Sequence, residues 1–523
     1  MKTIIQREKW RVASNYLRLF AGLAVGLVVT RLLVGLGESF YGVYVTITVG
    51  FGVSIMLTEL LRMGLVPVLG AEVQNGRIVD TSKFQEILSG GFIISVLFAL
   101  LGTCVMGLLA LWLLPGNSEN LVSASWVFLW CRVVMMFFVV MLTPFMCVLL
   151  VFSRQPKFNF YLFLERVAEL VSVALPLWIF VDWPDDLSSR LVQIGVCGSA
   201  LTILVYLYCA VDVSRNCLHS KLGFRFPSAA TTKKILGRVG WSSLQTISNN
   251  LYVRFDVVLV AALLGPAGTL AIGVAIRLMG YVRQATVGLV NGLDSVFANL
   301  AGAGRRGDST DVPDIQKNLL NISSSLQASL VFQGCVIILL LRDDLIALWL
   351  GGALEASATA QSLVNISDLS LLMVLGIAFR SLNLGWMSAL TGMGLAHRFT
   401  PWLAPGAIGN VLLLAGWYYF YQDAFTVLSV GWVFLAMQIL VHLVILPHVF
   451  ARELGVSLGQ LLRPMFIPFF IAVFTLITCV MVKQLLLAHS LVLRVLAVLV
   501  LVVLGLSAGL FHTRRVAKGT LET

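Results

Sequence analysis

The chain has 523 residues, of which 59% are hydrophobic and 12% charged, and its formal net charge is +11. Soluble domains are about 45–50% apolar and about 25% charged, so this composition excludes an ordinary soluble protein and indicates a polytopic membrane protein. The eight cysteines have no CxxC or other metal-ligand spacing. We therefore predict no metal site and interpret the cysteines as packing residues.

About fourteen apolar runs are long enough to cross a bilayer, which takes about 20 helical residues. Backbone polar groups must pair internally in lipid, so each run is predicted to be a helix. The basic start of the chain leads into a helix too long for a signal peptide, and we expect that helix to be retained. The predicted helices are 13–36, 41–69, 88–114, 122–150, 159–182, 190–212, 239–264, 269–299, 320–342, 363–393, 400–421, 425–450, 463–484 and 489–512.

The distribution of Lys and Arg predicts the orientation of these helices. With the N-terminus in the cytoplasm, the cytoplasmic segments hold about 24 of the 36 basic residues, and the opposite loops are acidic. This bias predicts an even number of helices with both termini cytoplasmic. The charge is therefore read as a topology signal, and no nucleic-acid partner is expected. The basic connector 214–238 is interpreted as an orientation anchor near anionic headgroups.

An internal repeat predicts the domain organisation. The segments TRLLVGLGESFYGVYVTI and DVVLVAALLGPAGTLAIGVAI each place a Leu-Gly turn between two apolar helices, and Gly265 follows Gly37 by 228 residues (265 − 37). Repeats of an even number of helices are related by an axis along the membrane normal. We predict two six-helix lobes related by a pseudo-two-fold axis along that normal. The predicted parts are an N-lobe at 1–213, a cytoplasmic linker at 214–238, a C-lobe at 239–452, and a C-terminal helix pair with a basic tail at 453–523.

Charged residues inside the predicted helices are the main functional signal. Glu59 with Arg62, and Arg166 with Glu169, are three residues apart and are predicted to pair. Five arginines lie deeper, where each costs about 2.5–3.5 kcal/mol at a helix centre: Arg132, Arg254, Arg277, Arg283 and Arg380.

Two interpretations of the deep arginines stay open. They could line a cavity that binds an anionic headgroup, because the guanidinium fork suits phosphate. They could instead act as structural polar clamps. Arg31, near the outer end of the first helix, can snorkel to the interface and is a further candidate for binding the headgroup.

The seventh predicted helix carries two polar stripes at 100° per residue. Asp256 ends one of them and is interpreted either as the counter-ion of a nearby arginine or as a coupling site for H⁺ or Na⁺; no other cofactor is expected. Ser243, Asn250 and Arg254 form the second stripe. The residues expected to line a polar cavity are Gln245, Asn249, Asn250 and Tyr252.

No sequence motif of an enzyme or a motor stands out. The chain contains no GxxxxGK[ST] or HExxH pattern and no GxSxG site that stands out, so neither an ATP-driven motor nor a known hydrolase site is predicted. The expected activity is transport.

Two segments carry a family resemblance. RLLVGLGESFYGVYVTITVGFGVSIMLTELLRMGL (31–65) and SNNLYVRFDVVLVAALLGPAGTLAIGVAIRL (248–278) resemble the openings of the two lobes of polysaccharide flippases, in the multidrug/oligosaccharidyl-lipid/polysaccharide exporter superfamily. The resemblance implies alternating access in a bacterial inner membrane. The implied substrate is an undecaprenyl-diphosphate-linked oligosaccharide, moved from the cytoplasmic to the periplasmic leaflet for capsule, exopolysaccharide or O-antigen synthesis. A polysaccharide polymerase and a chain-length regulator are the implied protein partners.

Three other functions remain in view. A lipid II flippase of the same superfamily would also carry the C-terminal helix pair. A drug/cation antiporter of the same fold would need deep carboxylates, whereas deep arginines outnumber them here. A non-transporting scaffold of a polysaccharide-assembly complex would not need a charged interior.

Overall fold

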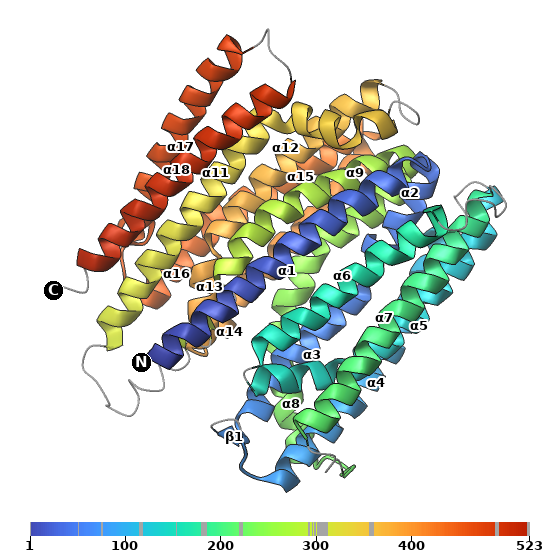
Figure 1. Cartoon of the computed structure of the whole chain (residues 1–523), viewed down its shortest axis with the longest axis vertical. Coiled ribbons are helices and arrows are strands. Elements are labelled where there is room, and N and C mark those ends of the chain that lie inside the picture. Colours follow the sequence, from blue (N-terminus) through green and yellow to red (C-terminus); the bar gives the residue numbers. More distant parts are fainter. Residues whose placement is uncertain are drawn as a thin grey trace. The chain divides into compact units, whose positions relative to one another are not determined.

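The computed structural model describes residues 2–519 except 51, 75–76, 114–118, 153, 179–185, 219–222, 291–292, 295, 298–299, 301–311, 355–359 and 487–490. The described chain is almost entirely helical, as predicted for an all-α polytopic membrane protein (Figure 1). A feature not predicted is a short antiparallel pair of strands, β1 (Val73–Gln74) and β2 (Arg77–Ile78), which follows the second membrane span.

The helices follow the predicted spans in chain order. They are α1 (Lys2–Val34), α2 (Glu38–Val45), η1 (Thr46–Gly50), α3 (Val53–Gly70), α4 (Thr81–Leu113), α5 (Glu119–Val151), α6 (Gln155–Trp178), α7 (Leu187–Asn216), α8 (Ala229–Asn250), η3 (Leu251–Phe255), α9 (Asp256–Val290), α11 (Val312–Leu354), α12 (Ala360–Leu382), α13 (Leu384–Gly392), α14 (Ala396–Phe420), η4 (Gln422–Ala424), α15 (Val427–Gln438), η5 (Ile439–Ile445), α16 (Leu446–Leu454), α17 (Leu458–Leu485) and α18 (Leu491–Gly519).

Twelve of the described helical stretches are long and apolar enough to cross a membrane. One of them, Ser243–Val290, contains a non-helical residue, Gly265. The helix α6 has 24 residues but carries Lys157, Glu165, Arg166 and Glu169, and it is not one of the twelve. The prediction of an all-α polytopic membrane protein with about fourteen helices is confirmed.

The two turns of the predicted repeat share an unusual backbone conformation. Gly37 has φ 108° and Gly265 has φ 67°, a region that glycine adopts readily and other residues rarely do. Each glycine reverses the chain between two apolar helices. The two Leu-Gly turns, 228 residues apart (265 − 37), therefore share a positive φ at the glycine.

Within the described residues, three membrane helices contain a π-helical segment: η1 in the second, η3 in the seventh and η5 in the twelfth. In a π-helix the hydrogen bond runs from residue i to i+5, so the regular α-helical ladder is interrupted at each end. The interrupted backbone must find other partners in a medium without water. These partners define the candidate site.

Contacts divide the chain into two compact units, which are 1–273 with 353–358, and 274–352 with 359–523. Helices α1 to α8, η3 and the first half of α9 belong to the first unit. The predicted lobe boundaries at 213, 238 and 452 remain predictions.

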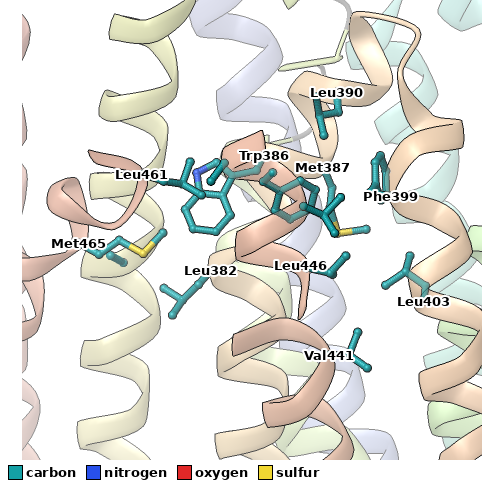
Figure 2. Packing of buried hydrophobic residues seen from close by; sticks show 14 of the residues in the cluster. Leu382, Trp386, Met387, Leu390, Phe399, Leu403, Val441, Leu446, Leu461 and Met465 are labelled. Carbon is teal, nitrogen blue, oxygen red and sulfur yellow. The ribbon is translucent and has the colours of Figure 1, made fainter. Parts of the chain in front are cut away.

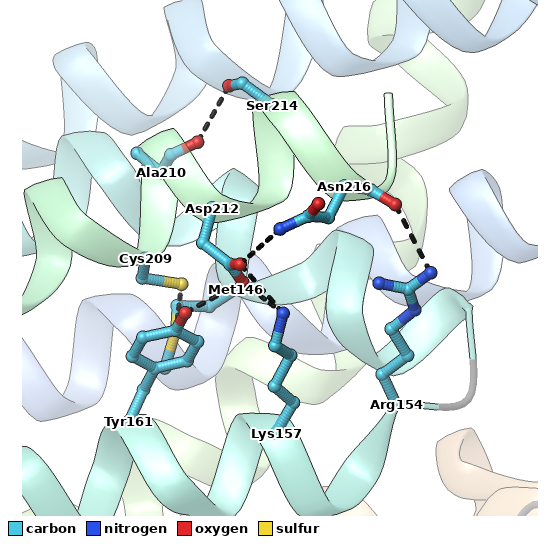
Figure 3. A network of polar contacts seen from close by, with 9 residues as sticks. All are labelled: Met146, Arg154, Lys157, Tyr161, Cys209, Ala210, Asp212, Ser214 and Asn216. Atoms are coloured by element: carbon cyan, nitrogen blue, oxygen red, sulfur yellow. Dashed lines mark hydrogen bonds and ion pairs between the residues drawn. The ribbon is translucent and has the colours of Figure 1, made fainter. Parts of the chain in front are cut away.

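A polar network joins α6 to the end of α7 in the first unit (Figure 3). The Asp212 carboxylate accepts hydrogen bonds from Lys157 Nζ (2.8 Å), the Tyr161 hydroxyl (2.8 Å) and the Asn216 amide (2.7 Å). Arg154 in turn donates to the Asn216 carbonyl (3.3 Å). Because the carboxylate has three donors, it can remain ionised close to the membrane.

The core of the second unit surrounds Trp386 on α13 (Figure 2). The Trp386 ring lies 5.7 Å from that of Phe450 on α16, and its indole nitrogen donates to Ser324 Oγ on α11 (2.9 Å). A buried tryptophan needs such a partner for its N–H. Leu461 and Met465 extend the same core to α17.

Ion pairs neutralise two basic residues on the predicted outer side of the second unit. Arg342 Nη2 lies 2.9 Å from Asp368, and Lys483 Nζ lies 2.8 Å from Asp344. The second pair also ties α17 to α11. Arg342 and Lys483 are basic residues on the side predicted to be acidic, and a nearby aspartate neutralises each of them.

We predict that Gly37→Ala and Gly265→Ala each destabilise the protein. A Cβ at either position meets no atom within 4 Å, so the cost comes from the positive φ alone and is about 1–3 kcal/mol. The measurement is the thermal unfolding midpoint of the purified protein in detergent. Gly107→Ala is the matched control, because Gly107 lies in α4 with open space around it, and it should be neutral or stabilising. Equal midpoints for all three variants would contradict the prediction.

Candidate functional site

Arg254 binds the interruption of the second membrane helix. Its Nη1 donates to the carbonyl of Val49 (2.8 Å), within η1, and its Nε donates to Asn250 Oδ1 (2.6 Å). Asn250 is fixed by its own bond to the Thr246 carbonyl (2.7 Å). Gly52 faces the guanidinium, and a Cβ there would overlap it. The contact explains how a charge is tolerated here, since an interrupted ladder leaves carbonyls that accept hydrogen bonds.

Arg132, on α5, lies next to the same region of the second helix. Its guanidinium carbon is 5.1 Å from the Phe128 ring centroid and 5.9 Å from that of Tyr44. The two rings are 5.7 Å apart, so they form an aromatic wall that attracts the cation. Among the described residues, Arg132 has no ion pair, and its buried Nε has no hydrogen-bond partner.

Both arginines therefore contact the stretch from Tyr44 to Val49. Arg132 approaches the start of that stretch through an aromatic ring, and Arg254 reaches its end through a backbone carbonyl. The stretch includes Thr46 and Thr48, whose hydroxyls bond to their own helix at 2.8 and 2.6 Å. We call the stretch 44–50, together with Arg132 and Arg254, the cationic site of the first unit.

The other residues predicted for the seventh helix are mostly shielded from the exterior. Tyr252 and Asp256 are completely buried, with 0% of each exposed, and Gln245 and Asn250 are half-buried. The side chain of Asn249 lies outside the described residues. The π-helix from 251 to 255 adds a residue per turn, so the predicted angles change beyond Asn250. Asn250 and Arg254, two members of the predicted second stripe, nevertheless form a direct hydrogen bond.

A second polar cluster lies between α12 and η5 in the second unit. Arg380 is 1% exposed, and Asn383 follows it on the same helical face, at the break between α12 and α13. The Asn383 amide donates to the His442 carbonyl (2.6 Å) and lies 3.3 Å from its Nδ1. Gln438, one turn before His442, is also completely buried.

The other predicted arginines differ in their surroundings. Arg277 and Arg283 are half-buried on the second half of α9. Arg31 is exposed in the last turn of α1, where a basic residue favours the helix dipole. The structure therefore places Arg132 and Arg254 at one site and Arg380 in a second cluster.

The two predicted local pairs are present. Arg166 lies 2.7 Å from Glu169, and Arg62 lies 3.6 Å from Glu59. The aromatic partners of Arg132 were not predicted from the sequence. Tyr44 lies on a different helix, and Phe128 lies one turn before Arg132 on the same helix but is uncharged, so neither residue signals a partner for a charge.

Comparisons with known proteins agree on the fold. No protein-family model matches the chain, and no curated protein matches it in sequence. Among solved structures, the lipid II flippase MurJ in an inward closed conformation matches with a TM-score of 0.62 and 11% identity, over 94% of this chain and 98% of that one. An inward-facing multidrug resistance MATE family transporter matches with a TM-score of 0.61 and 13% identity, over 89% and 98%.

A third solved structure is a MOP superfamily transporter from Pyrococcus furiosus, with a TM-score of 0.58 and 14% identity, over 86% of this chain and 96% of that one. At such identities the likeness concerns the fold. The chain has the fold of MOP superfamily transporters and is a multi-pass membrane protein.

We predict that Gly52→Ala and Arg254→Ala have non-additive effects on stability. The new Cβ would displace the guanidinium from Val49, so both variants lose the same contact. Each should cost about 1.5–3 kcal/mol, typical of a hydrogen bond to a charged group. A double-mutant cycle on unfolding midpoints measures the coupling. Additive effects would show that Gly52 acts independently of Arg254.

Proposed function

We propose that this protein is a flippase for a polyprenyl-diphosphate-linked oligosaccharide. In the proposed mechanism the protein alternates between two access states, carries the glycan and its diphosphate through its polar interior, and leaves the lipid tail in the membrane. The proposed setting is a bacterial inner membrane with both termini cytoplasmic. The product would supply surface polysaccharide synthesis.

The observation that supports the proposal is the state of Arg132. Its guanidinium is held against Tyr44 and Phe128, without a described ion pair and with a buried N–H that has no hydrogen-bond partner. A cation in such a setting favours an anionic ligand, because a low-dielectric environment strengthens its attraction. A diphosphate offers two charges and several acceptor oxygens to a guanidinium fork.

The charges of the interior weigh against a drug/cation antiporter. Two deep carboxylates of the first unit already have partners: Glu169 pairs with Arg166 (2.7 Å), and Glu165 accepts from the Tyr206 hydroxyl (3.3 Å). A site for cationic drugs needs carboxylates that are available. A scaffold without transport would not require a charged interior, which costs stability.

A lipid II flippase is the second candidate. MurJ matches 94% of this chain, whereas the MATE transporter matches 89%. Both proposed substrates share a polyprenyl diphosphate, so the arginines serve either one. The two proposed substrates differ only in the sugar that the diphosphate carries.

We predict that Arg132→Ala lowers the rate of flipping at least tenfold. The variant removes the proposed contact with the diphosphate, and a hydrogen bond to a charged group contributes about 1.5–3 kcal/mol. Arg254→Ala and Arg277→Ala should have similar effects, while Arg132→Lys should recover only part of the activity because lysine lacks the fork. The measurement is flipping of a polyprenyl-diphosphate oligosaccharide in proteoliposomes.

Arg463→Ala is the matched control, since Arg463 is exposed on α17 and is not one of the arginines predicted to bind the headgroup. Lipid II and a cationic dye serve as competing substrates in the same vesicles. Flipping of lipid II alone would favour the second candidate, and dye transport alone would favour an antiporter. Full oligosaccharide flipping by the alanine variants would refute the cationic site.

We predict that Asp256→Asn removes the dependence of transport on an ion gradient, if Asp256 is the coupling group. The carboxylate is completely buried, and binding H⁺ or Na⁺ would neutralise it at low cost. The assay compares flipping with an imposed proton gradient, a sodium gradient and none. Wild-type flipping that ignores both gradients would leave Asp256 with the counter-ion role.

A further inference from the structure

The connector between α7 and α8 is fixed to the first turns of α4. Glu86 Oε1 accepts hydrogen bonds from the Ser228 backbone (2.8 Å) and from Thr231 Oγ1 (2.8 Å). The Arg225 backbone donates to Ser89 Oγ (3.2 Å), and its side chain donates to Ser82. The connector segment 223–228 is therefore held against α4 by hydrogen bonds and forms an ordered surface.

This surface presents two aromatic rings to the exterior. Phe224 is 58% exposed and Phe226 is 82% exposed. Their centroids are 5.1 Å apart with the rings nearly perpendicular, so they form one apolar projection. Exposed phenylalanines in water are unfavourable, which indicates that something apolar covers them.

The position along α4 indicates what covers them. Arg225 lies beside Ser89, eight residues beyond the first residue of α4, and thus about 12 Å along that helix at 1.5 Å per residue. The exposed residues before this point are polar, such as Lys83, and the first exposed large apolar residue after it is Leu97. The two rings therefore lie near the level at which α4 passes from water into hydrocarbon.

Two exposed lysines follow the aromatic pair in the chain, in the first part of α8. Lys233 and Lys234 are exposed in the second turn of α8. Within the described part of the chain, neither of them forms an ion pair. An ordered surface with apolar rings and basic groups at a membrane boundary matches the chemistry of anionic lipid headgroups.

We propose that the connector surface, formed by Phe224, Phe226, Lys233 and Lys234, binds anionic phospholipids of the leaflet it faces. The rings enter the boundary between headgroups and acyl chains, and the lysines bind the headgroup phosphates. The interaction holds the start of α8 at a constant depth. It does not depend on the identity of the transported substrate.

The test is a lipid titration of the full-length protein in detergent, with bound lipid counted by native mass spectrometry. Dioleoyl phosphatidylglycerol should bind more tightly than dioleoyl phosphatidylcholine. Lys233→Gln with Lys234→Gln should weaken phosphatidylglycerol binding about 30-fold, because each lysine near an anionic surface contributes about fivefold. Phe224→Ser with Phe226→Ser should weaken it at least tenfold through lost burial.

Matched variants separate binding from folding. Lys317→Gln removes an exposed lysine elsewhere and should bind phosphatidylglycerol like the wild type, as should Lys233→Arg with Lys234→Arg. Added salt should weaken binding to the wild type and to the phenylalanine variant but affect the glutamine variant much less. The proposal is overturned if the wild type shows no preference for phosphatidylglycerol, or if the glutamine and serine variants bind it like the wild type.

Discussion

The absence of water inside the membrane is the constraint on which this structure depends. Every interruption of a helix there exposes backbone carbonyls that need a donor. The second membrane helix is interrupted at η1, and Arg254 donates to the Val49 carbonyl. The twelfth is interrupted at η5, and Asn383 donates to the His442 carbonyl. In both of these segments a carbonyl is thus matched by a polar side chain from a different helix.

This pairing of interruptions with donors explains why polar residues gather where they do. An α-helix in lipid needs no partner, so it can be wholly apolar. A π-segment needs one, and its partner brings charge or an amide into the interior. The polar interior is therefore a consequence of the irregular helices as much as a feature for binding substrate. Irregular segments and charged groups of this kind also recur at functional positions.

The sequence was sufficient for the parts of the fold that follow from local rules. Spans followed from apolar length, and the turns at Gly37 and Gly265 followed from the repeat, because a Leu-Gly reversal is a local event. The hydrogen bond between Asn250 and Arg254 followed from helical spacing. The π-segments could not be predicted, since the residue types of a stretch such as Leu251–Phe255 fit an α-helix equally well. The Arg132–Tyr44 contact joins distant helices, and no periodicity in one sequence encodes such a pairing.

The structure also separates two kinds of buried arginine. Arg254 uses its fork within the protein, with Nε on Asn250 and Nη1 on Val49, so directional hydrogen bonds hold it. Arg132 lies against ring faces, which attract the charge, and its hydrogen bonding is weak: Nη1 donates to Met135 Sδ (3.5 Å) and the buried Nε has no partner. A hydrogen-bonded clamp and a cation that can bind a ligand are thus combined on one short stretch of the second helix. Movement of that stretch would change both contacts together, because Arg132 faces Tyr44 and Arg254 donates to Val49.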